Sequence, residues 1–378
     1  MSADPRREKL DAAVLRWMRE ACSPEAWFGD EERFNELALE AFAFQALHCE
    51  PYARYCAAVG APTPGDWRKI PSVPAGAFKE LRLASFDENE TAKVFRTSGT
   101  SAGRCGELHL DTLELYEASL LPTLERLLLE SPTSPGGERI RVLAPSAEEA
   151  ADTSLSHMFD RLLAKHGDAQ SGFDVRGGVL DVHCLLESLE TARSDNEPVT
   201  LLGTAFAFVH LLEALDERGL ASLPALPAGS RAMETGGFKG RSREVERSVL
   251  HTAIANRIGF EAKRVINQYG MTELGSQFYD SSLVEPAAPV RKLGPPWARV
   301  RVVDPETGSQ VEPGEVGMIA VLDLANTGSV SAILTADLGR EIAAPGSPYG
   351  NGFEVLGRQP GAEERGCSIA ADLMLGNE

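Results

Sequence analysis

The sequence predicts an α/β fold built around a mostly parallel sheet with flanking helices, and three observations lead to this prediction. Between residues 139 and 267, short apolar segments typical of buried strands alternate with helical segments, and repeated strand–helix units of this kind form parallel sheets. The first 60 residues repeat apolar side chains at helical spacing. After about residue 290, short strands alternate with turns.

These patterns divide the chain into three parts. We expect an α/β core over residues 1–290 that begins with a helical region, a β-rich subdomain over 291–358 that completes this core, and a short tail over 359–378. A chain of 378 residues is long enough for one large domain or two ordinary ones.

The individual elements follow from periodicity and from helix-breaking residues. Leu10, Val14, Trp17 and Met18 mark a first helix, the stretch 34–47 marks a second, and prolines at 62, 64, 71 and 74 then break the chain into extended pieces. Further helices are expected over 111–130, 152–166, 206–218 and 241–257. The expected strands are 94–95, 140–143, 199–202, 231–235 and 264–267, followed by 299–303, 316–322, 332–335 and 353–356.

Composition and charge exclude several classes of function. The hydrophobic fraction of 43% and the charged fraction of 25% are those of a globular protein. The net charge of -19 argues against a nucleic acid or an anionic membrane as partner. No stretch reaches the roughly 18 apolar residues of a membrane span, and the polar start predicts no signal peptide. Six cysteines without a CxxC pair predict reduced thiols and a cytoplasmic protein.

The segment 97–103 combines small residues and hydroxyl groups in a way that suits an anion. It consists of Thr97, Ser98, Gly99, Thr100, Ser101, Ala102 and Gly103. Glycines allow backbone N–H groups to turn toward a phosphate, and the hydroxyls add further donors. The Walker lysine is absent, so this is not a P-loop of that type. The alternative is a surface turn rich in serine and glycine.

Three later segments carry chemistry that complements this loop. The segment 267–273 (NQYGMTE) follows a strand, and ligands of parallel sheets bind at the carboxyl ends of strands. It offers Tyr269 for stacking, Thr272 for a phosphate and Glu273 for Mg²⁺. The segment 335–339 places Asp337 in a predicted turn, and the strand 352–358 ends in Arg358.

In this order the four segments resemble the adenylate-forming enzymes, which include acyl-CoA synthetases, luciferases and peptide-synthetase adenylation domains. The resemblance spans residues 97 to 358. It implies ATP-dependent activation of a carboxylate as acyl-AMP, with pyrophosphate leaving. It also implies a role in nucleotide or substrate binding for each residue of the site. Thr97 to Gly103 would hold the β- and γ-phosphates, Tyr269 and Gly270 would lie at the adenine, Thr272 would contact the α-phosphate, Glu273 would bind Mg²⁺, Asp337 would hold the ribose, and Gly236 and Gly237 would lie against the adenine or the acyl pocket.

The chain departs from the wider superfamily at its C-terminus. Members carry about 100 further residues after the hinge arginine, forming a lid with a catalytic lysine. Here only 20 residues follow Arg358 (378 − 358 = 20), and none of them is a lysine. A tail of this length is too short to bury a core of its own. The cations that we would test as substitutes are Arg358, Lys79, Arg104 and Lys239.

The short tail is similar to that of one branch, the acyl-protein synthetase family of bacterial bioluminescence. The segments carrying this similarity are Phe78-Lys79, 96–103, 235–241 (TGGFKGR) and 365–368 (RGCS). The resemblance implies that a fatty acid or other carboxylic acid is activated, passed to Cys367 as a thioester, and delivered to a partner such as a fatty acid reductase. An acyl adenylate is a mixed anhydride, for which a thiolate is a good nucleophile, and Arg365 favours the thiolate.

Two other functions stay open at this point. A phenylacetate-type acyl-CoA or aryl-CoA ligase has similar motifs and a compact chain. A degenerate binding subunit of a reductase complex would explain the missing lysine. The apolar run 201–211 either lines an acyl tunnel or forms a buried strand and helix.

Overall fold

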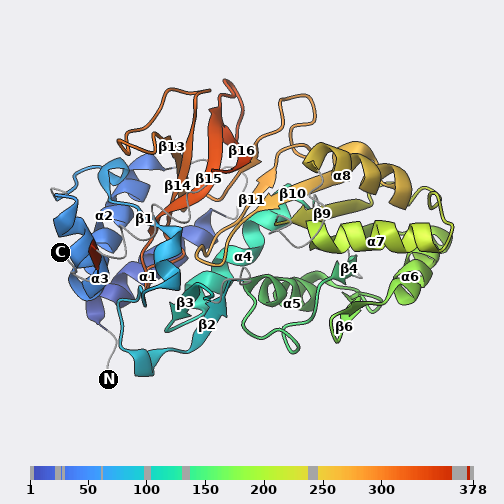
Figure 1. Cartoon of the computed structure of the whole chain (residues 1–378), viewed down its shortest axis with the longest axis horizontal. Helices are drawn as coiled ribbons and strands as arrows, with labels where there is room; N and C mark the ends of the chain where they lie inside the picture. Colours follow the sequence, from blue (N-terminus) through green and yellow to red (C-terminus); the bar gives the residue numbers. More distant parts are fainter. Residues whose placement is uncertain are drawn as a thin grey trace. The chain divides into compact units, whose positions relative to one another are not determined.

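The chain folds into two compact units, which we describe in turn from a computed structural model (Figure 1). The structure describes residues 4–21, 27, 30–60, 63–97, 104–129, 137–236, 246–359 and 373–374. Unit 1 comprises Met1–Pro122, Met271–Gln277 and Arg291–Glu378, and unit 2 comprises Thr123–Gly270 and Phe278–Val290. The N-terminal region therefore groups with residues 291–378. Within the described residues, no helix is both long and apolar enough to cross a bilayer.

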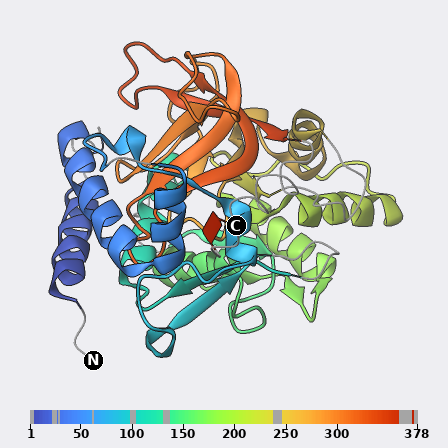
Figure 2. The same cartoon turned by 60° about the vertical axis from the view of Figure 1, so that its left-hand side comes forward.

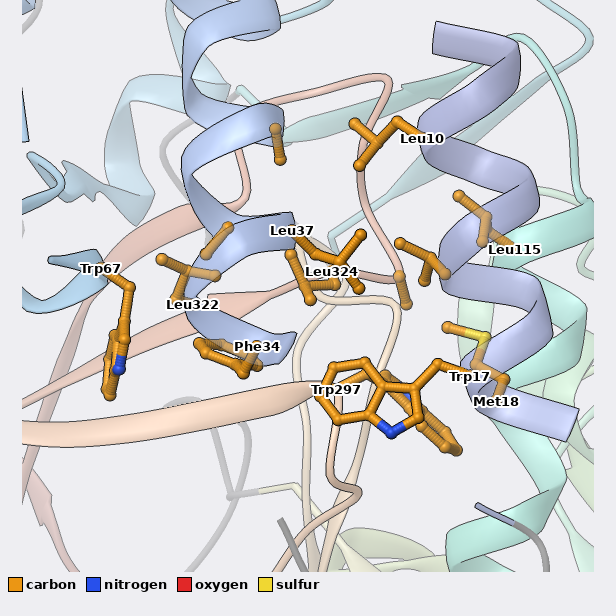
Figure 3. Close-up of a cluster of buried hydrophobic side chains, with 14 of the residues drawn as sticks. Leu10, Trp17, Met18, Phe34, Leu37, Trp67, Leu115, Trp297, Leu322 and Leu324 are labelled. Carbon is orange, nitrogen blue, oxygen red and sulfur yellow. The ribbon is translucent and has the colours of Figure 1, made fainter. Parts of the chain in front are cut away.

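The N-terminal helices of unit 1 pack against its strands through a shared hydrophobic cluster. These helices are α1 (Pro5–Glu20), α2 (Glu31–His48) and α3 (Glu50–Ala58), and aspartate side chains at positions 4 and 30 cap the first two. Figure 3 shows Trp17, Phe34 and Trp67 gathered with Trp297 and Leu322. Most side chains of the predicted apolar stripes are buried in this cluster or packed against it, whereas Leu47 of α2 is 63% exposed.

The strands of unit 1 form an antiparallel array ordered β13-β14-β15-β16-β12. Their bounds are β12 (Lys292–Leu293), β13 (Ala298–Val303), β14 (Val316–Asp323), β15 (Ala332–Ile342) and β16 (Gly352–Arg358), and β1 (Val73–Pro74) pairs with β15. A separate hairpin joins β2 (Lys93–Arg96) to β3 (Glu107–Leu110). Short 3₁₀ turns are η1 (Trp67–Lys69), η2 (Ala75–Lys79) and η3 (Glu88–Glu90). Figure 2 shows this array with the N-terminal helices beside it.

The predicted turn at residues 335–339 is wrong, because these residues lie inside β15. Asp337 faces Arg358 across the pair of strands, with a register shift between Leu338 and Gly339. A Cβ at Gly339 would lie 2.6 Å from the carbonyl oxygen of Glu354. The glycine therefore permits the close approach of neighbouring strands and does not mark a turn.

Unit 2 contains the parallel sheet that the sequence predicts. Its order is β5-β4-β8-β9-β10-β11, with every pair parallel except β10 with β11. The strands are β4 (Arg139–Leu143), β5 (Gly172–Phe173), β8 (Val199–Thr204), β9 (Arg231–Thr235), β10 (Val265–Tyr269) and β11 (Phe278–Asp280), and β6 (Val175–Arg176) pairs separately with β7 (Val179–Leu180). The α/β prediction is confirmed.

The helices of unit 2 cover this sheet. They are α5 (Ser154–His166), α6 (Val182–Asp195), α7 (Ala205–Glu217) and α8 (Arg247–Ile254), which continues into a π-helical turn, η4 (Ala255–Gly259), and then η5 (Ala262–Arg264). Helix α4 (Glu114–Leu127) begins in unit 1, and the division falls after its Pro122. The run 201–211 forms the end of β8 and the start of α7, where Leu201, Phe208 and Leu211 are buried in the core. The structural interpretation of that run is thus supported.

Two parts of unit 2 differ from the expected elements. Helix α6 was not expected, although Leu185, Leu189 and Ala192 give it an apolar stripe that packs into the core. The helix expected over 241–257 is observed as α8 from Arg247, while residues 241–245 lie outside the described part.

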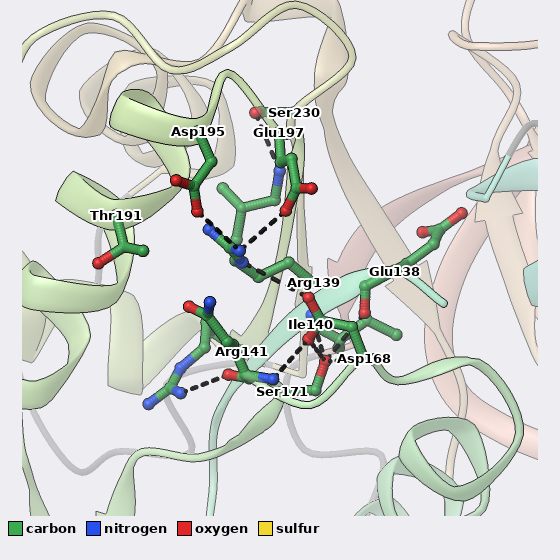
Figure 4. Close-up of polar contacts among 12 residues, drawn as sticks. Glu138, Arg139, Ile140, Arg141, Asp168, Ser171, Thr191, Asp195, Glu197 and Ser230 are labelled. Carbon is green, nitrogen blue, oxygen red and sulfur yellow. Dashed lines mark hydrogen bonds and ion pairs between the residues drawn. The ribbon is translucent and has the colours of Figure 1, made fainter. Parts of the chain in front are cut away.

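Arginines at the amino ends of the parallel strands hold unit 2 together at that edge. Arg139 pairs with Asp195 and Glu197 at 3.3 and 2.9 Å, so the strand β4 is tied to the end of α6 (Figure 4). Arg231 of β9 pairs with Glu138. Because buried arginines need paired carboxylates, these ion pairs give this edge a structural role, and ligands of parallel sheets bind at the opposite, carboxyl ends of the strands.

Candidate functional site

The carboxyl ends of three parallel strands in unit 2 lie in register. Thr204 of β8 is paired with Thr235 of β9, which is paired with Gln268 of β10. The hydroxyl of Thr235 donates to the backbone oxygen of Gln268 at 3.2 Å and also to its side chain. Strand β10 runs to Tyr269, so the first three residues of the NQYGMTE segment belong to the strand and not to a turn.

Gly236 and Tyr269 follow directly at this edge. Gly236 has a φ of 80°, which favours glycine, and a Cβ there would meet no atom within 4 Å. Tyr269 is half-buried, with its ring centroid 6.3 Å from that of Phe278. The next residue, Gly270, is also half-buried. The structure therefore brings two of the predicted adenine-site residues to one sheet edge beside open space.

A buried carboxylate fixes the start of the NQYGMTE segment. Glu234 of β9 accepts a hydrogen bond from Asn267 Nδ2 at 2.7 Å and lies 3.0 Å from His251 Nε2 on α8. The backbone N–H of Asn267 donates to Asp280 at 2.7 Å. These contacts link β9, β10, β11 and α8. His251 thus has a structural role, because its ring nitrogen lies within hydrogen-bonding distance of Glu234.

In unit 1, the base of the hydroxyl-rich loop lies beside Glu273. The backbone N–H of Gly106 donates to Thr97 Oγ1 at 2.8 Å, and the N–H of Thr97 donates to the oxygen of Gly106 at 2.9 Å. A Cβ added to Gly106 would lie 3.5 Å from both Thr97 Oγ1 and Glu273 Oε1. The predicted phosphate-binding threonine and the predicted metal-binding carboxylate are thus neighbours, although 176 positions separate them in the chain (273 − 97 = 176).

A buried hydrogen-bond network holds the turn that carries Glu273. Asp323 is fully buried and accepts from Ser276 N and Ser276 Oγ at 2.8 and 2.7 Å. Ser276 also contacts the hydroxyl of Ser119 at 2.9 Å, to which Trp297 Nε1 donates at 2.8 Å. Burial raises the pKa of Asp323, while the hydrogen bonds from Ser276 and Ala325 partly oppose that shift. The network fixes segment 271–277 within unit 1.

The Glu273 side chain belongs to a buried part of unit 1. Glu273 is 5% exposed, and Asn326 Nδ2 donates to its backbone oxygen at 3.2 Å. Among the described residues, no group of three or more His, Cys, Asp or Glu side chains could hold a metal ion. Mg²⁺ is usually held by one or two carboxylates together with nucleotide phosphates, and not by an all-protein cage. A single carboxylate such as Glu273 is compatible with that pattern.

Asp337 and Arg358 occupy neighbouring positions on β15 and β16. Arg358 Nε lies 3.8 Å from Asp337 Oδ1, and 56% of the Arg358 side chain is exposed. The Asp337 backbone N–H is held by Thr335 Oγ1 at 3.1 Å. The predicted ribose ligand and the predicted hinge arginine therefore lie side by side, with the arginine open to solvent.

Of the remaining predicted residues, some are described by the structure and the others lie outside the described residues. Thr272 is half-buried in the turn before Glu273, and Lys79 is half-buried at the end of η2. Arg104 is largely exposed and pairs with Glu80 at 2.7 Å. Ser98, Gly99, Thr100, Ser101, Gly103, Gly237, Lys239 and Cys367 lie outside the described residues.

Sequence reasoning missed the residues that support the site. Asp323, Asn326 and Ser276 belong to no motif that we recognised, and their roles depend on tertiary contacts. One signal was available, because Asp323 lies at the end of an apolar strand, where a carboxylate is unusual. Gly106 was also overlooked, since only the fold places it against Thr97 and Glu273.

Comparisons with known proteins agree with this geometry. A model of the family described as acyl-protein synthetase, LuxE, matches residues 173–375, which is 203 of the 378 residues. A long-chain-fatty-acid–luciferin-component ligase of Aliivibrio fischeri is 22% identical over 92% of this chain and 90% of its own length. The protein of the same name from Vibrio harveyi is 20% identical over the same shares of the two chains.

Solved structures share the fold. A 2-hydroxyisobutyryl-CoA ligase in the postadenylation state aligns with a TM-score of 0.60 at 13% identity, covering 88% of this chain and 69% of the other. An open conformation of that ligase aligns with a TM-score of 0.58 at 14% identity, covering 88% and 76%. These similarities show that the chain shares the fold of this ligase. Because the family match covers more than half of the chain and both relatives align along nearly all of it, the protein belongs to the LuxE acyl-protein synthetase family and is an acyl-activating ligase.

Proposed function

We propose that the protein uses ATP to activate a long-chain fatty acid as acyl-AMP and then transfers the acyl group to the thiol of Cys367. The observation that carries the proposal is the juxtaposition of Thr97, Gly106 and the buried Glu273 in one unit. The fatty-acid substrate is the one named for the relatives from Aliivibrio fischeri and Vibrio harveyi.

Each nucleotide-binding role is assigned to a residue of suitable chemistry. The loop of Thr97, Ser98, Gly99, Thr100, Ser101 and Gly103 binds the phosphates, Gly236, Gly237, Tyr269 and Gly270 surround the adenine, Thr272 contacts the α-phosphate, and Asp337 binds the ribose hydroxyls. Glu273 would hold Mg²⁺, which would supply positive charge to the phosphates. Preorganised donors and cations are the main means of stabilising such a transition state.

A cation from residues 1–358 stabilises the charge of the leaving pyrophosphate. Arg358 is our first candidate, because it is exposed and adjacent to Asp337. Lys79, Arg104 and Lys239 are the other candidates. Arg104 is held by Glu80 at 2.7 Å, so it would have to exchange that partner for a phosphate.

The acyl transfer is a substitution at the activated carbonyl carbon. The Cys367 sulfur forms the bond to this carbon, the bond to the phosphate oxygen breaks, AMP leaves, and the thiol proton passes to solvent. Two of the described cysteines are unsuitable acceptors. Burial raises the pKa of the Cys49 thiol and raises that of Cys56 to about 11. Cys105 is exposed and next to Gly106, which makes it the competitor to exclude.

The acyl group then passes to an acceptor protein, for which a fatty acid reductase is our proposal. The described cysteines are all free thiols, which suits a cytoplasmic location. Delivery of the acyl group to the acceptor protein depends on the thioester being formed.

Incubation with ATP, Mg²⁺ and labelled tetradecanoate tests the proposal. We expect a labelled protein band that hydroxylamine removes, that Cys367→Ser abolishes, and that the matched control Cys105→Ser retains. Equal labelling of Cys367→Ser would remove Cys367 from the mechanism. AMP release that depends on CoA would instead indicate an acyl-CoA ligase. An absence of ATP–pyrophosphate exchange with every carboxylate tried would indicate a binding subunit.

A further inference from the structure

The segment 324–331, which connects β14 to β15, is a loop that lies inside unit 1. Every one of its residues is buried, and Asn326, Thr327 and Ser331 are each at most 3% exposed. Connecting segments usually run over the surface, because the backbone N–H and C=O groups of a buried loop must all find partners. The burial of this loop therefore depends on hydrogen bonds from other parts of the chain.

Gln45 of α2 supplies several of these hydrogen bonds from one side chain. Its Nε2 donates to the backbone oxygens of Asn326 and Thr327, both at 3.2 Å, and to Ser331 Oγ at 2.7 Å. Its Oε1 accepts from the backbone N–H of Ser331 at 3.1 Å. Gln45 is 1% exposed, so water does not compete for these groups. Because the amide both donates and accepts, it joins the first half of the loop to its last residue.

The same loop holds the turn that carries Glu273. Asn326 Nδ2 donates to the backbone oxygen of Glu273 at 3.2 Å. A Cβ added to Gly275 would lie 2.7 Å from the Cβ of Ala325, so the turn and the loop are in direct contact. Asn326 is thus bound by Gln45 through its backbone and binds Glu273 through its side chain. A single residue joins Gln45 to Glu273, although 228 positions separate them in the chain (273 − 45 = 228).

We propose that Gln45 is a positioning residue for Glu273 and acts on it through Asn326 and the loop 324–331. The inference rests on the proposed role of Glu273 in holding Mg²⁺. A buried hydrogen-bond network favours one arrangement of the segments that it joins. A carboxylate that is already held in place binds a cation without the cost of first ordering its turn. Helix α2 thereby contributes to the site from a region that precedes the family match at residues 173–375.

The effect on position is tested on the protein without nucleotide or metal. Hydrogen–deuterium exchange measured by mass spectrometry reports how often the backbone amides of residues 271–277 open. We expect amide exchange in this segment to be about tenfold faster in Gln45→Met, which keeps the length of the side chain and removes its hydrogen bonds, and in Asn326→Ala. Ser331→Ala, a milder variant that removes one acceptor of Gln45, should show a smaller increase. Leu189→Ala, which weakens the core of unit 2, is the control for a general loss of stability and should leave this segment unchanged. Wild-type amide exchange in both Gln45→Met and Asn326→Ala would overturn the positioning role.

The consequence for activation is tested by ATP–pyrophosphate exchange over a range of Mg²⁺ concentrations. We expect Gln45→Met to raise the Mg²⁺ concentration at half-maximal rate about five- to tenfold and to change the KM for the carboxylate less than about twofold. Glu40→Gln, at an exposed position of the same helix, should match wild type. Because Gln45 acts through Glu273, adding Gln45→Met to Glu273→Gln should change the Mg²⁺ dependence less than about twofold further. Effects of the two substitutions that simply multiply would show that Gln45 acts independently of Glu273, and the proposal would be wrong.

These outcomes are distinguishable from failure of the proposed function. If Glu273→Gln alone leaves the Mg²⁺ dependence unchanged, the metal assignment is wrong. If the wild-type protein shows no ATP–pyrophosphate exchange with any carboxylate, the activation step itself is wrong. In both cases the amide exchange of residues 271–277 still decides whether Gln45 positions the turn that carries Glu273.

Discussion

Glu273 is a nearly buried carboxylate in a turn that hydrogen bonds hold on both sides. Its backbone oxygen accepts a hydrogen bond from Asn326, and the network of Asp323 and Ser276 fixes the following residues. Carboxylate oxygens are the protein ligands that Mg²⁺ prefers beside nucleotide phosphates, and we therefore propose Glu273 as the residue that holds the metal.

Substitution of Glu273 by Gln keeps the shape and removes the charge. We expect ATP–pyrophosphate exchange to fall by about 10²–10³-fold, the loss that follows removal of one group stabilising transition-state charge. The Mg²⁺ concentration at half-maximal rate should rise. Glu306→Gln, at an exposed position of the same unit, is the control. Normal exchange and an unchanged Mg²⁺ requirement in Glu273→Gln would refute the assignment.

At this scale Thr97 and Glu273 can be selected from the sequence because they belong to motifs in a recognisable order, and the structure places both beside Gly106. Their chemical roles stay predictions. Asp323 and Gly106 are not recognisable, because their roles arise from contacts between distant segments. The misassigned turn around Asp337 has a similar origin, since pairing with Arg358 on β16 decides its conformation.

At the scale of elements, helices α4 and α5 are joined by an ion-pair cluster in unit 2. Glu125 Oε1 lies 2.6 Å from Lys165 Nζ and 2.7 Å from His166 Nε2. Burial favours the neutral form of Glu125, but the hydrogen bonds from Lys165 and His166 outweigh it, and the pKa of Glu125 is lowered. The side chain is only 18% exposed, so water screens the cluster incompletely.

This cluster makes part of the stability depend on pH. Because the pKa of Glu125 is lower in the folded state, its contribution is present above its ordinary value, near 4.3, and is lost as pH falls through the lowered one. We expect Glu125→Gln to reduce the unfolding temperature at pH 6 by a few degrees and to have progressively less effect as pH falls through the lowered pKa of Glu125. Glu114→Gln, exposed on the same helix, should behave as wild type. An effect that grows toward acidic pH would contradict the assignment.

The elements themselves follow closely from the sequence where periodicity is strong. Strands β4, β8, β9 and β10 are short apolar runs between helices, and each lies within two residues of its predicted start and end. The weaker cases are α6, whose stripe we overlooked, and the two-residue strands β5, β6 and β7. A strand of two residues is defined by its neighbour's backbone and carries no periodic signal.

At the scale of the whole molecule, the net negative charge of the protein repels the anionic nucleotide that we propose as its ligand. The net charge is -19, and ATP with Mg²⁺ is also an anion. The surface therefore lowers the local concentration of nucleotide, while the site attracts it through amides, hydroxyls and a few cations.

Salt should weaken this repulsion. We expect the KM for ATP to fall about two- to threefold when ionic strength rises from about 0.02 to 0.2 M, since the Debye length shrinks below the size of the molecule. The inhibition constant of adenosine, which is uncharged, should be unchanged. A KM that increases with salt would show that local cations dominate the approach of the nucleotide.

The composition of unit 1 has a consequence for biosynthesis. Helices α1 and α2 bury their apolar faces against Trp297, Leu322 and Ala332, which leave the ribosome long after the helices do. Both segments of unit 2, Thr123–Gly270 and Phe278–Val290, are synthesised before residues 291–378 of unit 1. The apolar faces of α1 and α2 therefore wait for their strand partners through most of translation, and the nascent chain exposes surface of the kind that chaperones bind.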